Sequence, residues 1–554
     1  MSATSAVPDG AGLPRVRRRH LLIGAGATAL LGSSLTACKK DTATTNSVSK
    51  NDAVKLPTYT AIEGAKADFA GTAEGVEPAY KTYPTDHKKT VSERPGNGKD
   101  SITGMVINYS TVPPSADRNP FWQGLNQRLG VDLKLQIVPN ADYPQKFATV
   151  IAGNELPDMM LTQVVANFPS LLDKRFSPLD EYLSGDAIKD YPNLANIPTQ
   201  IWKSVIYNGH IYGLPLPRGL IGVYNFIRAD RFKEAGVSTA PKGFDELIDA
   251  GKALTNPKKR RWAYSMVNQP RALLARINEE PNGWQNEGGK FTHAYETDAY
   301  KQSLNDLISM WKSGVMHPDS FNDQQPFKEL FAAGNVAINA ADGYTGFNAY
   351  QQNGATSKGF ELGLMPVYTR DGSKLAPWAL GSGSFGMSSI KKMDADRIKL
   401  CLRVANYLAS PFGSEEYTYL SYGKEGRDHT LDKNGSPVVK ESQRAKVAVP
   451  MRYIGDGPKA DFTPGRPQDA KTQHDYQSME IPQGVADASI GLFSNAVATK
   501  NATAGTKFTD GVNAIVQGRK PFSEYDEILK AWQSEVGDAA RKEYQDQVQK
   551  HGAK

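Results

Sequence analysis

The pattern of apolar and polar residues predicts alternating strands and helices from Ile102 onward. Apolar residues dominate Ile102–Tyr109 and Met159–Leu161, and Val131–Val138 alternates with the period of two that is typical of a strand. Between these runs, Asn119–Leu129 and Tyr143–Ala152 place apolar residues at helical spacing. This order of strand, helix, strand, helix and strand predicts an α/β fold with a mainly parallel sheet.

Helices dominate the later part of the chain. The pattern predicts them at Ala229–Ala235, Phe244–Leu254, Asp298–Lys312, Lys328–Ala333, Asp394–Leu408 and Tyr525–Gln549. Thr369–Ser373 and Asp432–Ser436 each hold an Asp-Gly or Asn-Gly pair between extended runs, which predicts hairpin turns. Asp432–Gly435 also matches the start of a calcium loop, but the other ligands of such a loop are missing. We therefore favour the hairpin.

The first 37 residues carry a different pattern. Arg15–Arg19 holds four arginines, and Leu21–Leu35 is an apolar run of small and branched residues. A bilayer core requires about 20 apolar residues, so this run is too short to span it. Residues 1–37 are therefore predicted to be a signal peptide. Arg18–Leu22 also resembles the twin-arginine export motif, which we favour over the general export route.

The apolar run ends at a cysteine. Leu35–Lys40 places small residues before Cys38, and this arrangement resembles the bacterial lipobox. A thiolate is a strong nucleophile, so Cys38 could take a diacylglycerol as a thioether and become the new N-terminus. The chain has one other cysteine, Cys401, in an apolar helical pattern typical of a buried free thiol. With Cys38 acylated, no disulfide within the chain is expected.

Residues 38–99 are predicted to be the lipidated cysteine and a mostly flexible tether. They are rich in Thr, Ser, Ala, Lys, Asp and Gly and poor in large apolar residues. Such a composition buries too little surface to offset the entropy of ordering. Ala79–Pro84, which contains two tyrosines, is the part that we expect to be able to pack on the body.

Composition and charge exclude several classes of protein. Of the 554 residues 39% are hydrophobic and 22% are charged, the balance of a globular protein long enough for two lobes. The net charge is +6, and the first 37 residues supply +3 of it through four arginines and Asp9. The remainder has no basic stripe with interleaved aromatics, so no nucleic-acid partner is expected.

Seven segments together resemble one family. They are Ala152–Asp158, Tyr207–Pro215, Tyr224–Leu247, Phe331–Ile338, Trp378–Ser388, Tyr422–Thr430 and Phe508–Trp532. In this order they resemble the extracellular solute-binding proteins of ABC importers, in the carbohydrate class related to the maltose-binding protein, and most closely its long lipoprotein branch. Gly243 and Ile338 depart mildly from the family pattern, where a Thr or Ser and a methionine are usual.

The resemblance implies a two-lobed α/β fold of the periplasmic-binding-protein type (type II), with a ligand cleft between the lobes. We expect lobe one to hold residues 100–218 and 375–430, and lobe two to hold residues 222–368 and 435–554. Crossovers are expected near 215–224, 365–378 and 427–438. The implied function is capture of a carbohydrate, in particular an oligosaccharide, by a monomer anchored by lipid at the outer face of the cell membrane. The implied partners are the membrane subunits of the importer.

Six residues are candidates for ligand contact, because aromatic rings cover the apolar faces of a sugar and polar side chains bind its hydroxyls. Trp378 lies at a predicted crossover before small residues, and Asp342 and Tyr344 follow the predicted strand 336–340. Trp284 lies in a loop, and Asn119 and Trp122 open the first helix. For each residue the alternative is structural: core packing for the aromatics, a turn for Asp342 and a helix cap for Asn119.

Two other functions compete with this one. A glycosidase needs two facing carboxylates, and the adjacent pairs Glu279–Glu280 and Glu415–Glu416 do not face one site. Common hydrolase, zinc-site and phosphate-loop motifs are missing, so we expect neither an enzyme nor a cofactor or metal. An exported hydrolase and an adhesin or structural lipoprotein remain the alternatives.

Overall fold

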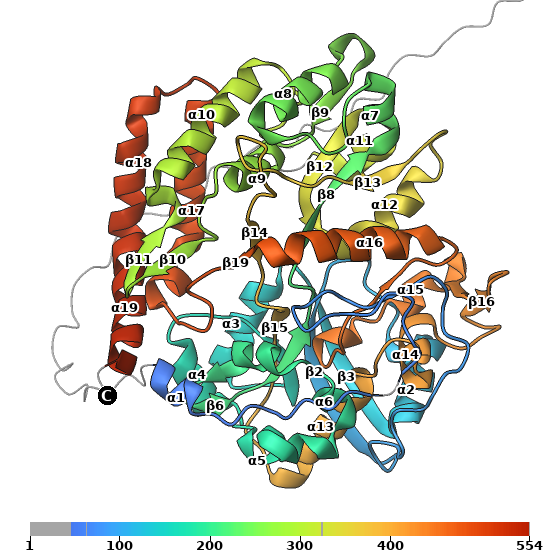
Figure 1. Cartoon of the computed structure of the whole chain (residues 1–554). Coiled ribbons are helices and arrows are strands. Elements are labelled where there is room, and N and C mark those ends of the chain that lie inside the picture. Colours follow the sequence, from blue (N-terminus) through green and yellow to red (C-terminus); the bar gives the residue numbers. More distant parts are fainter. Residues whose placement is uncertain (1–45, 63, 323–324, 553–554) are drawn as a thin grey trace, which may run out of the picture. The chain divides into compact units, whose positions relative to one another are not determined.

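The structure, a computed structural model, describes residues 46–62, 64–322 and 325–552 (Figure 1). The expected signal peptide and Cys38 lie outside the described residues. Within the described part of the chain, no helix combines the length and apolar character needed to cross a membrane.

Five strands form the first sheet, in the order β3-β2-β4-β15-β7. They are β2 (Asp100–Asn108), β3 (Val131–Pro139), β4 (Met159–Thr162), β7 (Leu214–Pro217) and β15 (Ser384–Ile390). The strand β2 runs parallel to β3 and β4, and β15 is antiparallel to β4 and β7. The predicted parallel sheet is therefore confirmed for β2, β3 and β4.

Helices cover this sheet and bury one core with it. They include α2 (Pro120–Leu129), α3 (Tyr143–Gly153), α4 (Phe168–Arg175), α13 (Ala395–Leu408), α14 (Glu415–Tyr422) and α15 (Arg444–Val447). Asn119 accepts the backbone N–H groups of Phe121 and Trp122 and so caps α2, and Gly130 ends the helix at a φ of 62°. Cys401 of α13 is a buried free thiol, as expected.

The second sheet has the order β13-β8-β12-β9. Its strands are β8 (Val223–Arg228), β9 (Trp262–Tyr264), β12 (Val336–Gly343) and β13 (Leu362–Leu364). The helices of this half include α7 (Ala229–Ala235), α8 (Gly243–Leu254), α9 (Asn268–Ile277), α10 (Asp298–Lys312), α11 (Phe327–Ala332), α12 (Phe347–Gly354) and α17 (Asn495–Val516). The predicted last helix is α18 (Tyr525–Trp532) and α19 (Asp538–Gly552), joined by a π-helical turn. A separate apolar core lies among these elements.

The chain passes between the two sheets several times. It leaves the first sheet after Pro217 and enters the second at Val223, and it returns between Leu364 and Ser384. A further passage was expected near 427–438, and this is wrong. Asp432–Ser436 instead closes the local hairpin of β16 (His429–Leu431) and β17 (Pro437–Val439), and Met451 and Ile454 still pack in the first core.

The later passage follows Ile454. The helix α16 (Pro467–Glu480) contacts β13 and lies between the regions that carry the two sheets (Figure 1). Its Tyr476 packs against Tyr224 of β8 and against Trp378. Residues 444–454, which were assigned to lobe two, therefore belong to the core of lobe one.

The expectation of a flexible tether is wrong from Asn46 onward. The helix α1 (Val48–Asp52) packs against α19, and β1 (Ala79–Tyr80) pairs in parallel with β18 (Asp461–Phe462). Tyr83 is 1% exposed, and its hydroxyl lies 2.8 Å from that of Thr418. Few large apolar residues suffice here, because Val76 and Tyr83 are buried against later parts of the chain.

Candidate functional site

Large apolar side chains remain exposed where the strands of the first sheet end. Tyr109 and Val112 follow β2, Val164 follows β4, and they are 56%, 49% and 55% exposed. Phe385, 40% exposed, lies at the same edge because β15 begins where the antiparallel β4 ends. In open α/β sheets, ligands bind beyond the carboxyl ends of the parallel strands. This edge is therefore the candidate binding surface.

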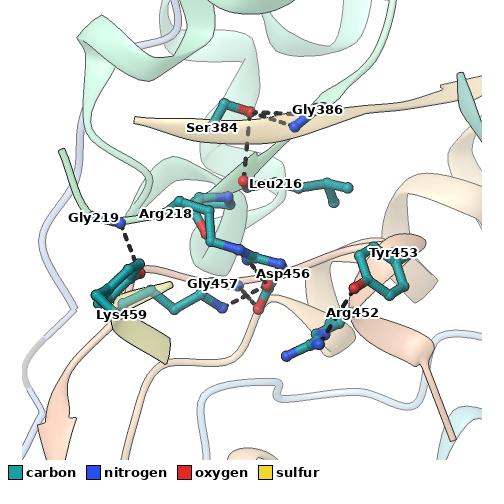
Figure 2. A network of polar contacts seen from close by, with 12 residues as sticks. Leu216, Arg218, Gly219, Ser384, Gly386, Arg452, Tyr453, Asp456, Gly457 and Lys459 are labelled. Atoms are coloured by element: carbon teal, nitrogen blue, oxygen red, sulfur yellow. Dashed lines mark hydrogen bonds and ion pairs between the residues drawn. The ribbon is translucent and has the colours of Figure 1, made fainter. Parts of the chain in front are cut away.

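A β-bulge presents Phe385 there. The register between β15 and β7 shifts between Ser384 and Met387. The Ser384 hydroxyl accepts the backbone N–H of Gly386 at 3.2 Å and lies 3.4 Å from the Leu216 carbonyl, which holds the bulge to β7 (Figure 2). Bulges change the direction of a side chain in this way and are frequent beside binding sites.

Three aromatic rings form a cluster at this edge. The centroid of Phe385 lies 6.3 Å from that of Tyr109 and 5.2 Å from that of Tyr453, and the latter two lie 6.4 Å apart. Tyr453 is 2% exposed, so it supports the two exposed rings from below. The guanidinium of Arg218 lies 5.1 Å from the ring centroid of Phe385.

A cavity of about 500 Å³ adjoins the cluster. It is lined by the end of β2, by α14 and by the segment that follows α15, and the residues are Asn108, Tyr109, Ser110, Leu408, Ser410, Tyr417, Leu420, Ser421 and parts of 448–460. Cavities of this size are typical of small-molecule sites. Aromatic and amide or hydroxyl groups thus face the same space.

Charged groups gather at one end of this cavity. Asp456 Oδ2 binds Arg218 Nη1 at 2.9 Å and also Lys459 Nζ (Figure 2). Burial lowers the pKa of Lys459, and the charge of Asp456 opposes that effect. Arg452 Nη2 donates to the Tyr453 hydroxyl at 3.3 Å instead.

Two buried carboxyl groups lie behind these charges. Gln477 donates to Asp461 Oδ2 at 2.8 Å and accepts the backbone N–H of Glu77 at 2.9 Å. Burial raises the pKa of Glu77 to about 7, while the charge of Lys459 lowers it. Burial, followed by the charge of Glu77, raises the pKa of Asp461 well above its usual value. This pair therefore retains protons at pH values where an exposed pair is fully ionised.

The structure separates the six expected ligand contacts. Asn119 is fully buried, caps α2 and donates to the Lys446 carbonyl, and Trp122 is 4% exposed with its indole N–H on the Leu133 carbonyl. Trp284 is 5% exposed between Trp532 and Tyr544 in the second core. In this structure the two tryptophans fill the cores that position the sheets and Asn119 caps a helix, so a ligand contact by these three residues stays a prediction.

The other three lie in the second half. Trp378 is 2% exposed, with the Arg276 guanidinium 3.8 Å from its ring centroid, so its ring is covered in this structure and its ligand contact stays a prediction. Tyr344 packs in the same apolar cluster, and its hydroxyl accepts the Gly219 N–H at 2.8 Å and donates to Glu77 at 3.3 Å. Asp342 binds Lys328 at 3.2 Å and stays partly exposed. Ligand contact by Tyr344 and Asp342 stays a prediction.

Sequence reasoning missed Tyr109, Phe385 and Arg452. Tyr109 is the last residue of the first predicted strand, so the rule on carboxyl ends of parallel strands could have found it. Phe385 lies inside a segment that carries the family resemblance. Arg452 lies in an irregular segment and had no such signal. Among the described residues, no group of three or more His, Cys, Asp or Glu side chains is placed to hold a metal ion.

These features define a two-lobed α/β binding protein. The sequence profile of the bacterial extracellular solute-binding proteins matches residues 124–418, more than half of the chain, and the chain belongs to this family. Two relatives are from Bacillus subtilis (strain 168). The polygalacturonan/rhamnogalacturonan-binding protein YtcQ is 22% identical over 484 residues, which cover 83% of this chain and 94% of that protein. Lipoprotein LipO is 24% identical over 489 residues, which cover 82% and 94%.

Solved structures share the fold. The substrate-binding protein FusA of the S. pneumoniae ABC transporter, in complex with kestose, has a TM-score of 0.59 at 16% identity and covers 82% of this chain and all of its own. The N-glycan transport solute-binding protein NgtS from Streptococcus pneumoniae has a TM-score of 0.60 at 13% identity, with 82% and 99% covered. The expected two-lobed solute-binding fold is confirmed.

Proposed function

We propose that this protein captures an oligosaccharide at the outer face of the cell membrane and delivers it to the membrane subunits of an ABC importer. The proposal includes a lipid on Cys38 that anchors the chain after the signal peptide is removed. It assigns no catalytic step to the protein, so the sugar leaves the site unchanged.

The observation that carries the proposal is the pair of exposed rings, Tyr109 and Phe385, beside the cavity of about 500 Å³. A sugar ring has apolar C–H faces, which pack well on aromatic rings, and a belt of hydroxyls. Asn108, Ser110 and Ser421 line the same cavity and offer hydrogen-bond partners for hydroxyls. The relatives are named for polygalacturonan binding, for a complex with kestose and for N-glycan transport, and these names support a carbohydrate ligand.

A thermal-shift screen tests the proposal. The full-length protein in mild detergent is heated with a panel of neutral and acidic mono- and oligosaccharides, and the sugar is then recovered and weighed by mass spectrometry. A ligand at 100 times its Kd adds about 2.7 kcal/mol to the free energy of unfolding. Stabilisation by one sugar class with unchanged sugar supports a receptor. Cleaved sugar points to a hydrolase, and no shift across the panel removes carbohydrate as the ligand.

A further inference from the structure

The candidate cavity carries more positive than negative charge. Arg452 and Lys459 line it together with Asp456, and Arg218 adjoins it through its ion pair with Asp456. Both Arg218 and Lys459 bind the same oxygen of Asp456, so one negative charge serves two cations. Within the described residues, Arg452 forms no ion pair, and its guanidinium donates to the Tyr453 hydroxyl at 3.3 Å.

The two buried carboxyl groups near Lys459, those of Glu77 and Asp461, do not cancel the excess of positive charge. Glu77 interacts with Lys459 and Arg218, but burial raises its pKa to about 7, so it is only partly ionised at neutral pH. Burial, followed by the charge of Glu77, raises the pKa of Asp461 well above its usual value. The excess of positive charge also affects Tyr109, which lines the cavity. Burial raises the pKa of Tyr109, and the positive charges of Arg452 and Arg218 oppose that rise.

Arg452 is placed to meet a ligand on the aromatic cluster. Its guanidinium lies 5.2 Å from the ring centroid of Tyr453, and the Tyr453 ring contacts those of Phe385 and Tyr109. The side chain is exposed and lines the cavity, so its donors are open to a ligand. A guanidinium offers a planar fork of N–H groups that matches both oxygens of a carboxylate.

We propose that the cavity selects an acidic oligosaccharide, in which a uronic acid carboxylate binds Arg452 while the sugar ring packs on Tyr109 and Phe385. This inference rests on the proposed function and narrows it from any sugar to a negatively charged one. A neutral oligosaccharide is the competing ligand, for which Arg452 donates to a hydroxyl and gains little from its charge.

Matched probes isolate the charge. Binding to the full-length protein in detergent is measured by calorimetry with trisaccharides of galacturonate, mannuronate and glucuronate, each as the free acid and as its methyl ester. The ester keeps the sugar skeleton and removes the negative charge. We expect at least one acid to bind about tenfold or more tightly than its ester, and this ratio to fall as salt is raised.

Variants assign the effect to one residue. Arg452→Gln should weaken binding of the acid about tenfold and binding of the ester less than threefold, and Arg452→Lys should restore part of the loss. Arg444→Gln is the matched control, because Arg444 is an exposed arginine that is paired with Glu441 at 2.8 Å. Its acid-to-ester ratio should equal that of the unchanged protein.

The outcomes separate this inference from the function. If neutral oligosaccharides bind and every uronate fails, or if acid and ester bind alike, the charge selection is overturned while the receptor stands. An equal loss for acid and ester in Arg452→Gln overturns the role of Arg452. If no sugar of either kind binds, the proposed function itself falls.

Discussion

At the scale of single residues, the site depends on which aromatic side chains remain uncovered. Trp122, Trp284 and Trp378 are each at most 5% exposed, whereas Phe385 is 40% exposed on a bulge. A large aromatic ring stabilises a core when it is buried, and it can bind a ligand when it is held open at the surface. The two roles predict opposite results for substitution.

Phe385→Ala should reduce affinity for the cognate sugar about three- to tenfold and change the free energy of unfolding by no more than about 0.5 kcal/mol. The reason is that the ring is 40% exposed and belongs to neither buried core. Trp122→Ala should cost about 3–5 kcal/mol of stability, because its ring fills the first core. Calorimetric titration and chemical denaturation of both variants measure the contrast. A Phe385→Ala protein with unchanged affinity contradicts the aromatic edge as the binding surface.

Glu77 should make the stability of the protein depend on pH. Burial raises its pKa from 4.5 to about 7 in the folded state. Its stabilising contribution is therefore complete below about pH 4.5 and is lost as the pH rises through about 7, and Asp461 acts in the same direction. Over this window the free energy of unfolding should fall by about 2–3 kcal/mol.

Glu77→Gln should flatten this pH dependence, because the amide keeps an acceptor for the Tyr344 hydroxyl and has no charge to bury. Urea denaturation at several pH values between 4.5 and 8 measures the slope. Glu74→Gln, at an exposed position three residues earlier, is the control and should keep the slope. Equal slopes in the two variants would assign the effect to another group.

At the scale of elements, the sequence predicts the helices and strands whose stabilising contacts are local. Helices α7 and α10 occupy the residues that the pattern gave, because each has an apolar face at helical spacing and α10 begins at the capping residue Thr297. The strands β2, β3 and β4 follow from their own apolar patterns, whereas the pattern did not predict β7 and β15. The segment 46–99 could not be predicted in this way, because its partners lie hundreds of residues away, as Glu416 does for the N–H groups of Thr90 and Val91.

The site falls between these two cases. That the carboxyl edge binds a ligand follows from the order of strands, since Tyr109 ends the first of them. Which side chains are open at that edge depends on the bulge at Ser384 and on the fold of 448–460, and neither leaves a periodic pattern in the sequence.

The docking of the N-terminal segment can be tested at Tyr83. Its ring packs against Phe412, Tyr422 and Phe462, so Tyr83→Ala should cost about 3 kcal/mol and release the segment around β1. Hydrogen exchange of residues 79–91 should become faster, and limited proteolysis should cut there first. Tyr59→Ala is the control at a half-exposed tyrosine of the same segment. Unchanged exchange after Tyr83→Ala would mean that other contacts hold the segment.

At the scale of the whole molecule, the N-terminal segment that contains Glu77 and Thr90 contacts both lobes. It therefore links them, as do the three later passages of the chain between the two sheets. Glu77 binds Gln477 and Tyr344 of the second half, and Thr90 binds Glu416 of the first. A hinge motion between the lobes therefore has to bend this segment as well as the passages at 217–223, 364–384 and 454–467. We expect this constraint to limit how far the lobes separate.

Spin labels at one exposed position in each lobe measure this motion. In a Cys38→Ser background, Gln145→Cys on α3 and Lys312→Cys at the end of α10 can be labelled selectively, because Cys401 is buried with a pKa raised to about 12 by burial. Saturating sugar should shorten and narrow the distance distribution of this pair. The pair Gln145→Cys and Lys399→Cys, both in the first lobe, should not change. A ligand that binds tightly and leaves the first pair unaltered would mean that capture occurs on the carboxyl edge of one lobe alone. In that case the second lobe contributes no contact to the bound sugar, and the predicted roles of Tyr344 and Asp342 fall with it.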